Sequence, residues 1–387
     1  MPSFNLAIGH LERALELGAD THEVHYNLSV ILSERGNRTM HRGDDPTADY
    51  RAATHHGAAA VELVPDSVAG LSHLAAAHAR IAEYQVRTGV DPTASLDGGI
   101  AAATRASELE PDRVSAKSVL VVTSFLRGQW LEKTGRDGTP YFEETLLRAE
   151  AAAESFPGVF FPDFMGGQAH IELARIDARR GVDPAPRAAE AREWYARGLA
   201  KVDGLAGPQT EQAIRELVEA RYALGTGGDP RPFARKALEH ADLAVELDPA
   251  RSDAVRLRGE AELVLAVDAD RRGDARAGSL FERAHTSLDV ARGVDLKDAR
   301  NPLALASWAW HKAQSRLGAS AEEVEAGLDA AREAQRLDGQ QMEALALEGA
   351  LLTLDPETRA EGAAKIRDAI AGNAHLSVKW GELAAAR

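Results

Sequence analysis

The sequence predicts an all-α solenoid, and three observations lead to this prediction. Apolar residues make up 44% of the 387 residues but aromatic residues only 5%, with alanine prominent, which favours close-packed helices over β-sandwiches. The sequence is also similar to itself at a fixed period, which indicates a repeat architecture. We expect about eight elongated helical hairpins. The third observation is that glycines recur every 46 residues: Gly43, Gly89, Gly135, Gly181, Gly227 and Gly273.

The corner between the two helices of each hairpin is marked by the pattern Gly-x-Asp-Pro. Glycine just after a helix adopts the left-handed conformation that ends it. A basic residue two positions earlier, such as Arg87, complements the helix dipole. The aspartate then supplies a capping carboxylate, and the proline suits the first helical position. The aspartates are Asp45, Asp91, Asp137, Asp183 and Asp229, and Ala275 stands in the sixth place.

A second proline series ends the second helix of a hairpin. It comprises Pro65, Pro111, Pro157 and Pro249, and three of the four follow Glu-Leu-x. In the best-formed copy we therefore predict a long first helix over residues 68–88 and a shorter second helix over 93–109. At 1.5 Å per residue the long helix measures about 30 Å.

Apolar side chains recur at fixed places of the repeat, which we call slots. One slot of the second helix is always small, and two other slots are mostly large. A continuous core shared by stacked neighbours is typical of solenoids, because no single hairpin buries these residues alone. The small slot holds Ala14, Ala60, Ala106, Ala152, Gly198 and Ala244; the large slots hold Tyr50, Leu96, Phe142 and Leu280, and Tyr84, Trp130, Ile176 and Tyr222.

We predict a single repeat domain over residues 1–387, regular over 1–290 and degenerate over 291–387. A final helix over His375–Ala386 carries Leu376, Trp380 and Leu383 on one face, so we expect it to close the C-terminal end. Residues 4–17 read as a second helix without its first, so we expect either that the chain is cut from a longer one or that its start lies inside a repeat array.

The hairpin endings Ala60–Pro65, Ala106–Pro111 and Ala244–Pro249 resemble the end of a tetratricopeptide repeat (TPR). The usual period of that repeat is about 34 residues, so this unit is about 12 residues longer. We place the extra residues around the Gly-x-Asp-Pro corner, where they lengthen mainly the first helix. HEAT and armadillo repeats of about 40–47 residues are the alternative. The resemblance implies a TPR-like α-solenoid.

The longer pattern Arg-x-Gly-x-Asp-Pro, seen in residues 87–111, resembles the repeats that lie C-terminal to the kinase domain of bacterial eukaryotic-like serine/threonine kinases. Arg179–Pro184 and Gly227–Pro249 carry it too. The resemblance implies a regulatory or scaffolding region. The chain itself has no Gly-rich phosphate loop, His-Arg-Asp or Asp-Phe-Gly motif. One alternative is a free-standing adaptor. The other is a helical-repeat enzyme, whose active site would need acidic residues or histidines at positions outside the repeat register.

Composition excludes several kinds of partner and of site. The net charge of −15 argues against general binding of nucleic acid or anionic membranes, which needs clustered positive charge. The absence of cysteine excludes disulfides, Cys-ligated zinc and thiol nucleophiles, and it fits the cytoplasm. No apolar run approaches the roughly 20 residues that span a bilayer. We expect a protein or peptide partner, and no nucleic acid or membrane.

Neither metal binding nor catalysis is expected. Eight of the 13 histidines fall within residues 10–78, but His10, His56 and His240 share one repeat slot, which favours a packing or surface role. His-Glu-x-x-His, Gly-x-Ser-x-Gly and Ser-x-x-Lys motifs are absent. The chain is therefore predicted to be non-catalytic and to carry no cofactor.

The surface expected to bind a partner is the concave face, which first helices line in TPR-like solenoids. Alignment to the repeat places small and apolar residues there, which suit a helix or an apolar peptide. The aromatic run over 156–164 also fits plain core packing, and we favour that interpretation for the run as a whole. The candidate groove residues are Ser118, Val122, Phe125, Phe161, Phe164 and Gln168.

Overall fold

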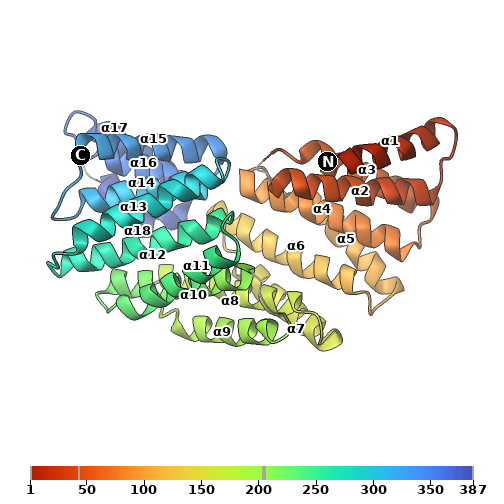
Figure 1. Ribbon diagram of the computed structural model, residues 1–387, viewed down its shortest axis with the longest axis horizontal. Coiled ribbons are helices and arrows are strands. Elements are labelled where there is room, and N and C mark those ends of the chain that lie inside the picture. The colour runs from red at the N-terminus through yellow and green to blue at the C-terminus, as the bar shows by residue number, and fades with distance from the viewer. Residues whose placement is uncertain (1, 42–43, 203–205, 386–387) are drawn as a thin grey trace. The chain divides into compact units, whose positions relative to one another are not determined.

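The computed structural model describes residues 2–41, 44–202 and 206–385, and no strand occurs within these ranges. Consecutive helices pair into hairpins, as Figure 1 shows. The chain divides into two compact units: unit 1 comprises Met1–Leu131 and Pro140–Met165, and unit 2 comprises Glu132–Thr139 and Gly166–Arg387.

Unit 1 contains the N-terminal helices. Its elements are α1 (Pro2–Glu16), α2 (His22–His41), α3 (Thr47–Leu63), α4 (Val68–Thr88), α5 (Thr93–Leu109), most of α6 (Val114–Lys133) and α7 (Thr139–Ser155), and the start of α8 (Phe161–Arg179).

Unit 2 contains the remaining helices and the corner that follows α6. Its elements after α8 are α9 (Ala185–Leu199), α10 (Ala206–Thr226), α11 (Arg231–Leu247), α12 (Ser252–Arg271), α13 (Ala277–Val294), α14 (Arg300–Ala313), α15 (Ala321–Leu337), α16 (Met342–Leu352), α17 (Arg359–Gly372), the 3₁₀ turn η1 (Ala374–Leu376) and α18 (Ser377–Ala385).

The predicted hairpin is confirmed, because α4 and α5 have the predicted bounds of 68–88 and 93–109. α1 covers most of the predicted lone second helix. The predicted final helix is divided into η1 and α18, and Ala386 lies outside the described residues. Eight hairpins, α2/α3 through α16/α17, occur within the described ranges.

The corners have the predicted conformation. The corner glycines have φ values of 75° (Gly89), 72° (Gly135), 76° (Gly181), 81° (Gly227) and 69° (Gly273), all left-handed, while Gly43 lies outside the described residues. At the corner after α4, the Asp91 carboxylate accepts a hydrogen bond from the backbone N–H of Thr93 at 2.9 Å. The sequence predicted the aspartate as the N-cap and the proline as the first helical residue. In the structure Pro92 is the N-cap and Thr93 is the first helical residue.

The buried stripe of α13 is displaced by one residue from the 46-residue register. The slot series predicts a buried Leu280, yet Phe281 is the fully buried residue. Likewise Ala291 is fully buried whereas Val290 is 46% exposed. The regular register therefore breaks at α13, before residue 290, directly after the corner in which Ala275 replaces the aspartate.

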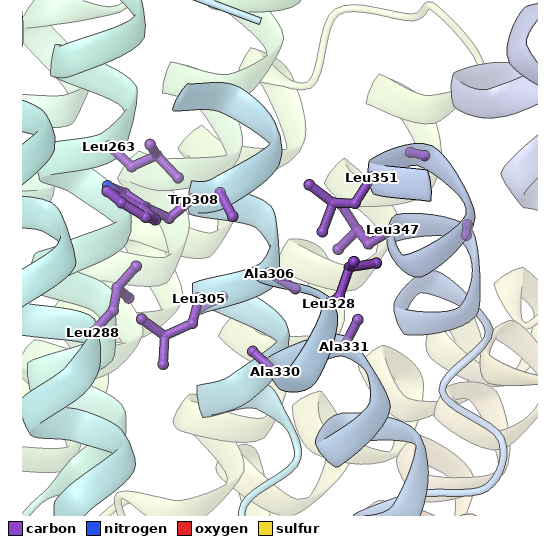
Figure 2. Close-up of a cluster of buried hydrophobic side chains, with 14 of the residues drawn as sticks. Leu263, Leu288, Leu305, Ala306, Trp308, Leu328, Ala330, Ala331, Leu347 and Leu351 are labelled. Atoms are coloured by element: carbon purple, nitrogen blue, oxygen red, sulfur yellow. The ribbon is translucent and has the colours of Figure 1, made fainter. Parts of the chain in front are cut away.

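A cluster of buried apolar side chains in unit 2 joins α12 through α18. Figure 2 labels members of this cluster from α12 to α16. Trp308 is 3% exposed and donates its indole N–H to the carbonyl oxygen of Phe281 at 2.9 Å. Trp380 of α18 is 1% exposed and meets Trp310 edge to face. Leu376 and Leu383 also pack against this cluster, and the capping role of the last helix remains a prediction.

The packing of α8 against α9 depends on two adjacent glycines. A Cβ atom at Gly166 would overlap the indole ring of Trp194, and one at Gly167 would overlap the phenol ring of Tyr195. The two glycines therefore let α8 and α9 approach closely. His170, one turn later on α8, is buried beside Trp194, and its Nδ1 has no hydrogen-bond partner. Burial, and to a smaller extent the Arg187 guanidinium, lowers the pKa of His170 to about 4.

Substitution of Gly166 by alanine should destabilise unit 2 by about 1–3 kcal/mol, because the added methyl group forces the Trp194 ring from its place. Urea unfolding followed by circular dichroism measures this loss. Gly158→Ala is the matched control, since a Cβ there meets nothing within 4 Å. Equal unfolding midpoints for the two variants would contradict the packing.

Stability should fall as the pH falls from about 6.5 to about 4, and His170 should account for part of the loss. The unfolded chain binds the His170 proton near pH 6.5 and the folded chain near 4, so the unfolded state binds more protons between these values. The full contribution is about 3 kcal/mol. In urea titrations at pH 7 and pH 4.5, His170→Gln should lose less stability than wild type, whereas exposed His10→Gln should behave like wild type.

Candidate functional site

The predicted groove residues of α6 lie in unit 1 and differ in exposure. Ser118 and Val122 are half-buried. Phe125 is 8% exposed and meets Phe142 of α7 edge to face, with ring centroids 5.6 Å apart. Ser118 and Val122 are therefore open to contact in part, while Phe125 belongs to the packed interior.

The predicted groove residues at the start of α8 show the same division. Phe161 is half-buried, whereas Phe164 is 9% exposed and meets Phe160 edge to face at 5.5 Å. The packing of Phe164 supports the core interpretation of the aromatic run for this ring. The groove in unit 1 remains a prediction, with Ser118, Val122 and Phe161 as its partly exposed members.

Gln168, the last predicted groove residue, lies in unit 2 and holds a half-buried carboxyl group. Its side-chain amide donates to Glu211 of α10 at 2.9 Å, and the Tyr195 hydroxyl donates to the other oxygen of Glu211 at 3.2 Å. Burial raises the pKa of Glu211, despite these two hydrogen bonds, and the nearby Asp253 carboxylate raises it further.

The slots of Phe161, Phe164 and Gln168 recur 92 residues later, on α12, as Asp253, Arg256 and Glu260. Glu260 accepts hydrogen bonds from Arg256 and, at 2.8 Å, from Arg221 of α10. Burial alone raises the pKa of Glu260, but the two guanidinium groups outweigh it and lower that pKa to about 2. The carboxylate is therefore charged and fixed at neutral pH.

The first turn of α14 extends this group of charges. Arg300 donates through Nε and Nη2 to the two oxygens of Asp298, at 2.9 and 2.5 Å. Burial raises the pKa of Asp298, but Arg300 holds it well below its usual range. The Arg300 guanidinium also interacts electrostatically with Asp253 and Glu260. We call this set the first-helix ionic cluster: Arg221, Asp253, Arg256, Glu260, Asp298 and Arg300.

The ionic cluster presents charged groups that are held in place by ion pairs. Its three arginines and three carboxylates balance in charge, and none of its members is a nucleophile beside a base. The side chains of Arg221 and Arg300 are 52% and 54% exposed, although a carboxylate anchors each of them. A guanidinium has five N–H donors, so both arginines present further donors on a fixed group.

Sequence reasoning missed this cluster although a signal for it existed. The predicted groove was read from α6 and α8, and adding 92 to the α8 positions gives Asp253, Arg256 and Glu260. Arg221 and Arg300 stand outside those three slots, so only their contacts reveal them.

The clustered histidines of unit 1 are occupied with one another. His25 contacts His56 through their Nδ1 atoms at 2.9 Å, and its Nε2 contacts the Asp20 carboxylate at 2.8 Å. Among the described residues, no group of three His, Cys, Asp or Glu side chains could hold a metal ion. None of the described helices is long and apolar enough to cross a membrane.

Comparison with known proteins finds similarity in structure. No family model matches the chain, and no curated protein matches it. A tetratricopeptide repeat protein from Parabacteroides merdae is 12% identical with a TM-score of 0.52, over 84% of this chain and 99% of that one. In the anaphase-promoting complex hetero-tetramer Cut9–Hcn1, one chain is 13% identical with a TM-score of 0.51 over 90% of this chain.

The chain spans about half (52%) of the Cut9–Hcn1 chain that it matches. A thermophilic TPR protein from Thermus thermophilus matches 61% of this chain at 16% identity, with a TM-score of 0.40. At such identities the likeness concerns the fold. The protein is an all-α, TPR-like solenoid.

Proposed function

We propose that this chain is a non-catalytic protein–protein interaction module, and that the slots of its first helices carry the binding surface. The TPR-like fold supports this proposal, because stacked first helices form an extended surface with regularly spaced side chains. The observation that carries the proposal is the anchored exposure of Arg221 and Arg300 in the first-helix ionic cluster.

Stability alone does not account for such a cluster. Buried and half-buried ion pairs contribute little net stability, because desolvation offsets their attraction. They do hold side chains in one geometry, and groups fixed before binding lose less entropy when a partner arrives. Arginine is also enriched where interfaces concentrate their binding energy. The cluster therefore suits recognition of polar and charged groups on a partner chain.

The proposed surface differs in chemistry along the chain. In unit 1, Ser118, Val122 and Phe161 offer small and apolar contacts, while Phe125 and Phe164 are buried. In unit 2, Gln168 adjoins the first-helix ionic cluster through Glu211. The surface of unit 1 suits an apolar segment, and the surface of unit 2 suits a charged one. Nucleic acid fits poorly, given the net charge of −15 and the balanced cluster.

We further propose that the module is the C-terminal regulatory or scaffolding region of a bacterial serine/threonine kinase, acting in the cytoplasm. The Arg-x-Gly-x-Asp-Pro corners at residues 87–92 and 179–184 support this assignment by resemblance. The alternative is a free-standing adaptor with the same binding surface. A helical-repeat enzyme ranks third.

Glutamate at the proposed surface should reduce partner capture. We expect Val122→Glu and Arg221→Glu each to lower the yield of the captured partner by about tenfold, the effect of losing an interface hot spot. Tagged protein in an extract of its own cells, with quantitative mass spectrometry, gives the yields. Leu147→Glu and Arg235→Glu, on exposed sites of second helices, are the matched controls. Retained capture by both first-helix variants would overturn the proposal.

The kinase proposal predicts a native protein well above 41.4 kDa. An immunoblot of the source cells, with an antibody raised against this chain, measures the size. Kinase activity should then co-migrate with the large band in an in-gel assay. A single band at 41.4 kDa would exclude the attached kinase and favour the free-standing adaptor.

A further inference from the structure

The C-terminal end of α6 is capped by a turn from the far end of the chain. The last carbonyl groups of a helix have no partner within that helix. Here the side-chain amide of Asn373 donates to the carbonyl oxygens of Glu132 and Lys133, each at 3.2 Å. Asn373 Oδ1 meanwhile accepts from the backbone N–H of His375 at 3.0 Å and so holds its own turn.

Further polar contacts join the same two segments, and all of them lie within unit 2. Lys133 forms an ion pair with Asp338. His375 Nε2 lies 3.3 Å from the carbonyl oxygen of Arg136 and 3.6 Å from the Glu132 carboxylate. The backbones approach so closely that a Cβ at Gly135 would lie 2.9 Å from the nitrogen of Ala374.

The corner after α6 is also tied to α8, the first long helix of unit 2. Arg179 pairs with Glu132 at 2.5 Å, and Arg180 pairs with Asp137 at 3.3 Å. Unit 2 therefore closes on itself: α8 leads through successive hairpins to η1, η1 contacts the corner, and the corner contacts α8. Burial lowers the pKa of Lys133, and the like charge of Arg300 lowers it further, which places Lys133 within electrostatic range of the first-helix ionic cluster.

The contact is polar, unlike the joints between neighbouring hairpins. Its members are carbonyl groups, an amide, an imidazole and an ion pair, and none of them belongs to the apolar cluster of α12–α18. Contacts with few buried apolar groups open at low free-energy cost. The contact can therefore open while the apolar cluster of α12–α18 stays packed.

We propose that the contact between the corner Glu132–Thr139 and the segment Asn373–His375, with Asp338, is a releasable clasp that controls access to the first-helix ionic cluster. When the clasp is closed, the corner and η1 join the two ends of unit 2, and the side chains of Arg221 and Arg300 are about half exposed. When it opens, the first helices separate from the corner and admit a partner segment. The access step rests on the proposed function, whereas the closure itself does not.

Asn373→Asp is the sharpest variant for testing the clasp. The carboxylate keeps the acceptor for the His375 N–H, so the local turn is retained. It loses the donor to the two carbonyl groups and places negative charge against them and beside Glu132. Lys379→Met serves as a control, because the Lys379–Glu343 pair lies near the same end but outside the contact.

The first measurement is the distance across the clasp. The chain has no cysteine, so spin labels at Arg136→Cys and Val378→Cys report on the contact alone. Electron–electron dipolar spectroscopy should give one narrow short distance in the wild-type background and with Lys379→Met. With Asn373→Asp the distribution should broaden to longer distances. An unchanged distribution, in a variant with a wild-type circular dichroism spectrum, would overturn the clasp.

The second measurement tests access without any partner. A single cysteine at Ile214, in the slot of α10 that corresponds to Gln168 and Glu260, is labelled with a maleimide carrying a large polyethylene glycol chain. Asn373→Asp should raise the labelling rate about tenfold, the order expected when a hydrogen-bonded contact opens locally. Labelling at exposed Glu193→Cys should be unchanged.

The two measurements separate the failure of the clasp from the failure of the proposed function. Equal labelling rates at Ile214→Cys, with or without the clasp variant, would show that the contact does not control access. If the distance and the labelling change as expected but no partner is captured, the proposed function fails and the clasp stands.

Discussion

The left-handed glycine at the corners after α4, α6, α8, α10 and α12 is the constraint on which the regular part of the solenoid depends. It ends one helix within a single residue. The carboxylate of the aspartate that follows accepts a hydrogen bond from the first backbone N–H of the next helix, as Asp91 does from Thr93. Because each hairpin turns at the same point of the repeat, equivalent residues meet equivalent neighbours. Where the pattern fails, at Ala275, the buried stripe of the following helix shifts by one residue and Phe281 replaces Leu280 in the core.

This regularity also determines what the first helices present. A slot that is free of hairpin packing in one repeat tends to be free in the next, so its residues vary in chemistry without disturbing the core. In this chain Glu260 occupies the same slot as Gln168, two repeats later, and Arg221 and Arg256 donate hydrogen bonds to its carboxylate. At the end of α6, the last carbonyl groups have no partner within the helix. The side-chain amide of Asn373 donates hydrogen bonds to two of them.

Features set by neighbouring residues could be predicted from the sequence, whereas features set by distant contacts could not. The bounds of α4 and α5 follow from corner glycines and prolines that act locally. The close approach at Gly166 was foreseeable because glycine pairs favour it. The partner of Lys133 is 205 residues away, and no local pattern points to Asp338. The burial of Phe125 and Phe164 likewise depends on how the helices rotate, which the slot alignment does not fix to within one residue.

The claim that first helices bind the partner is tested most directly by site-specific photocrosslinking in the source cells. A photoreactive amino acid placed at Val122 or Ile214 samples first-helix slots of the two units, and one at Leu147 or Leu243 samples exposed sites of second helices. Our account predicts that Val122 and Ile214 form adducts with a common protein while Leu147 and Leu243 form none. Adducts from the second-helix positions alone would contradict it.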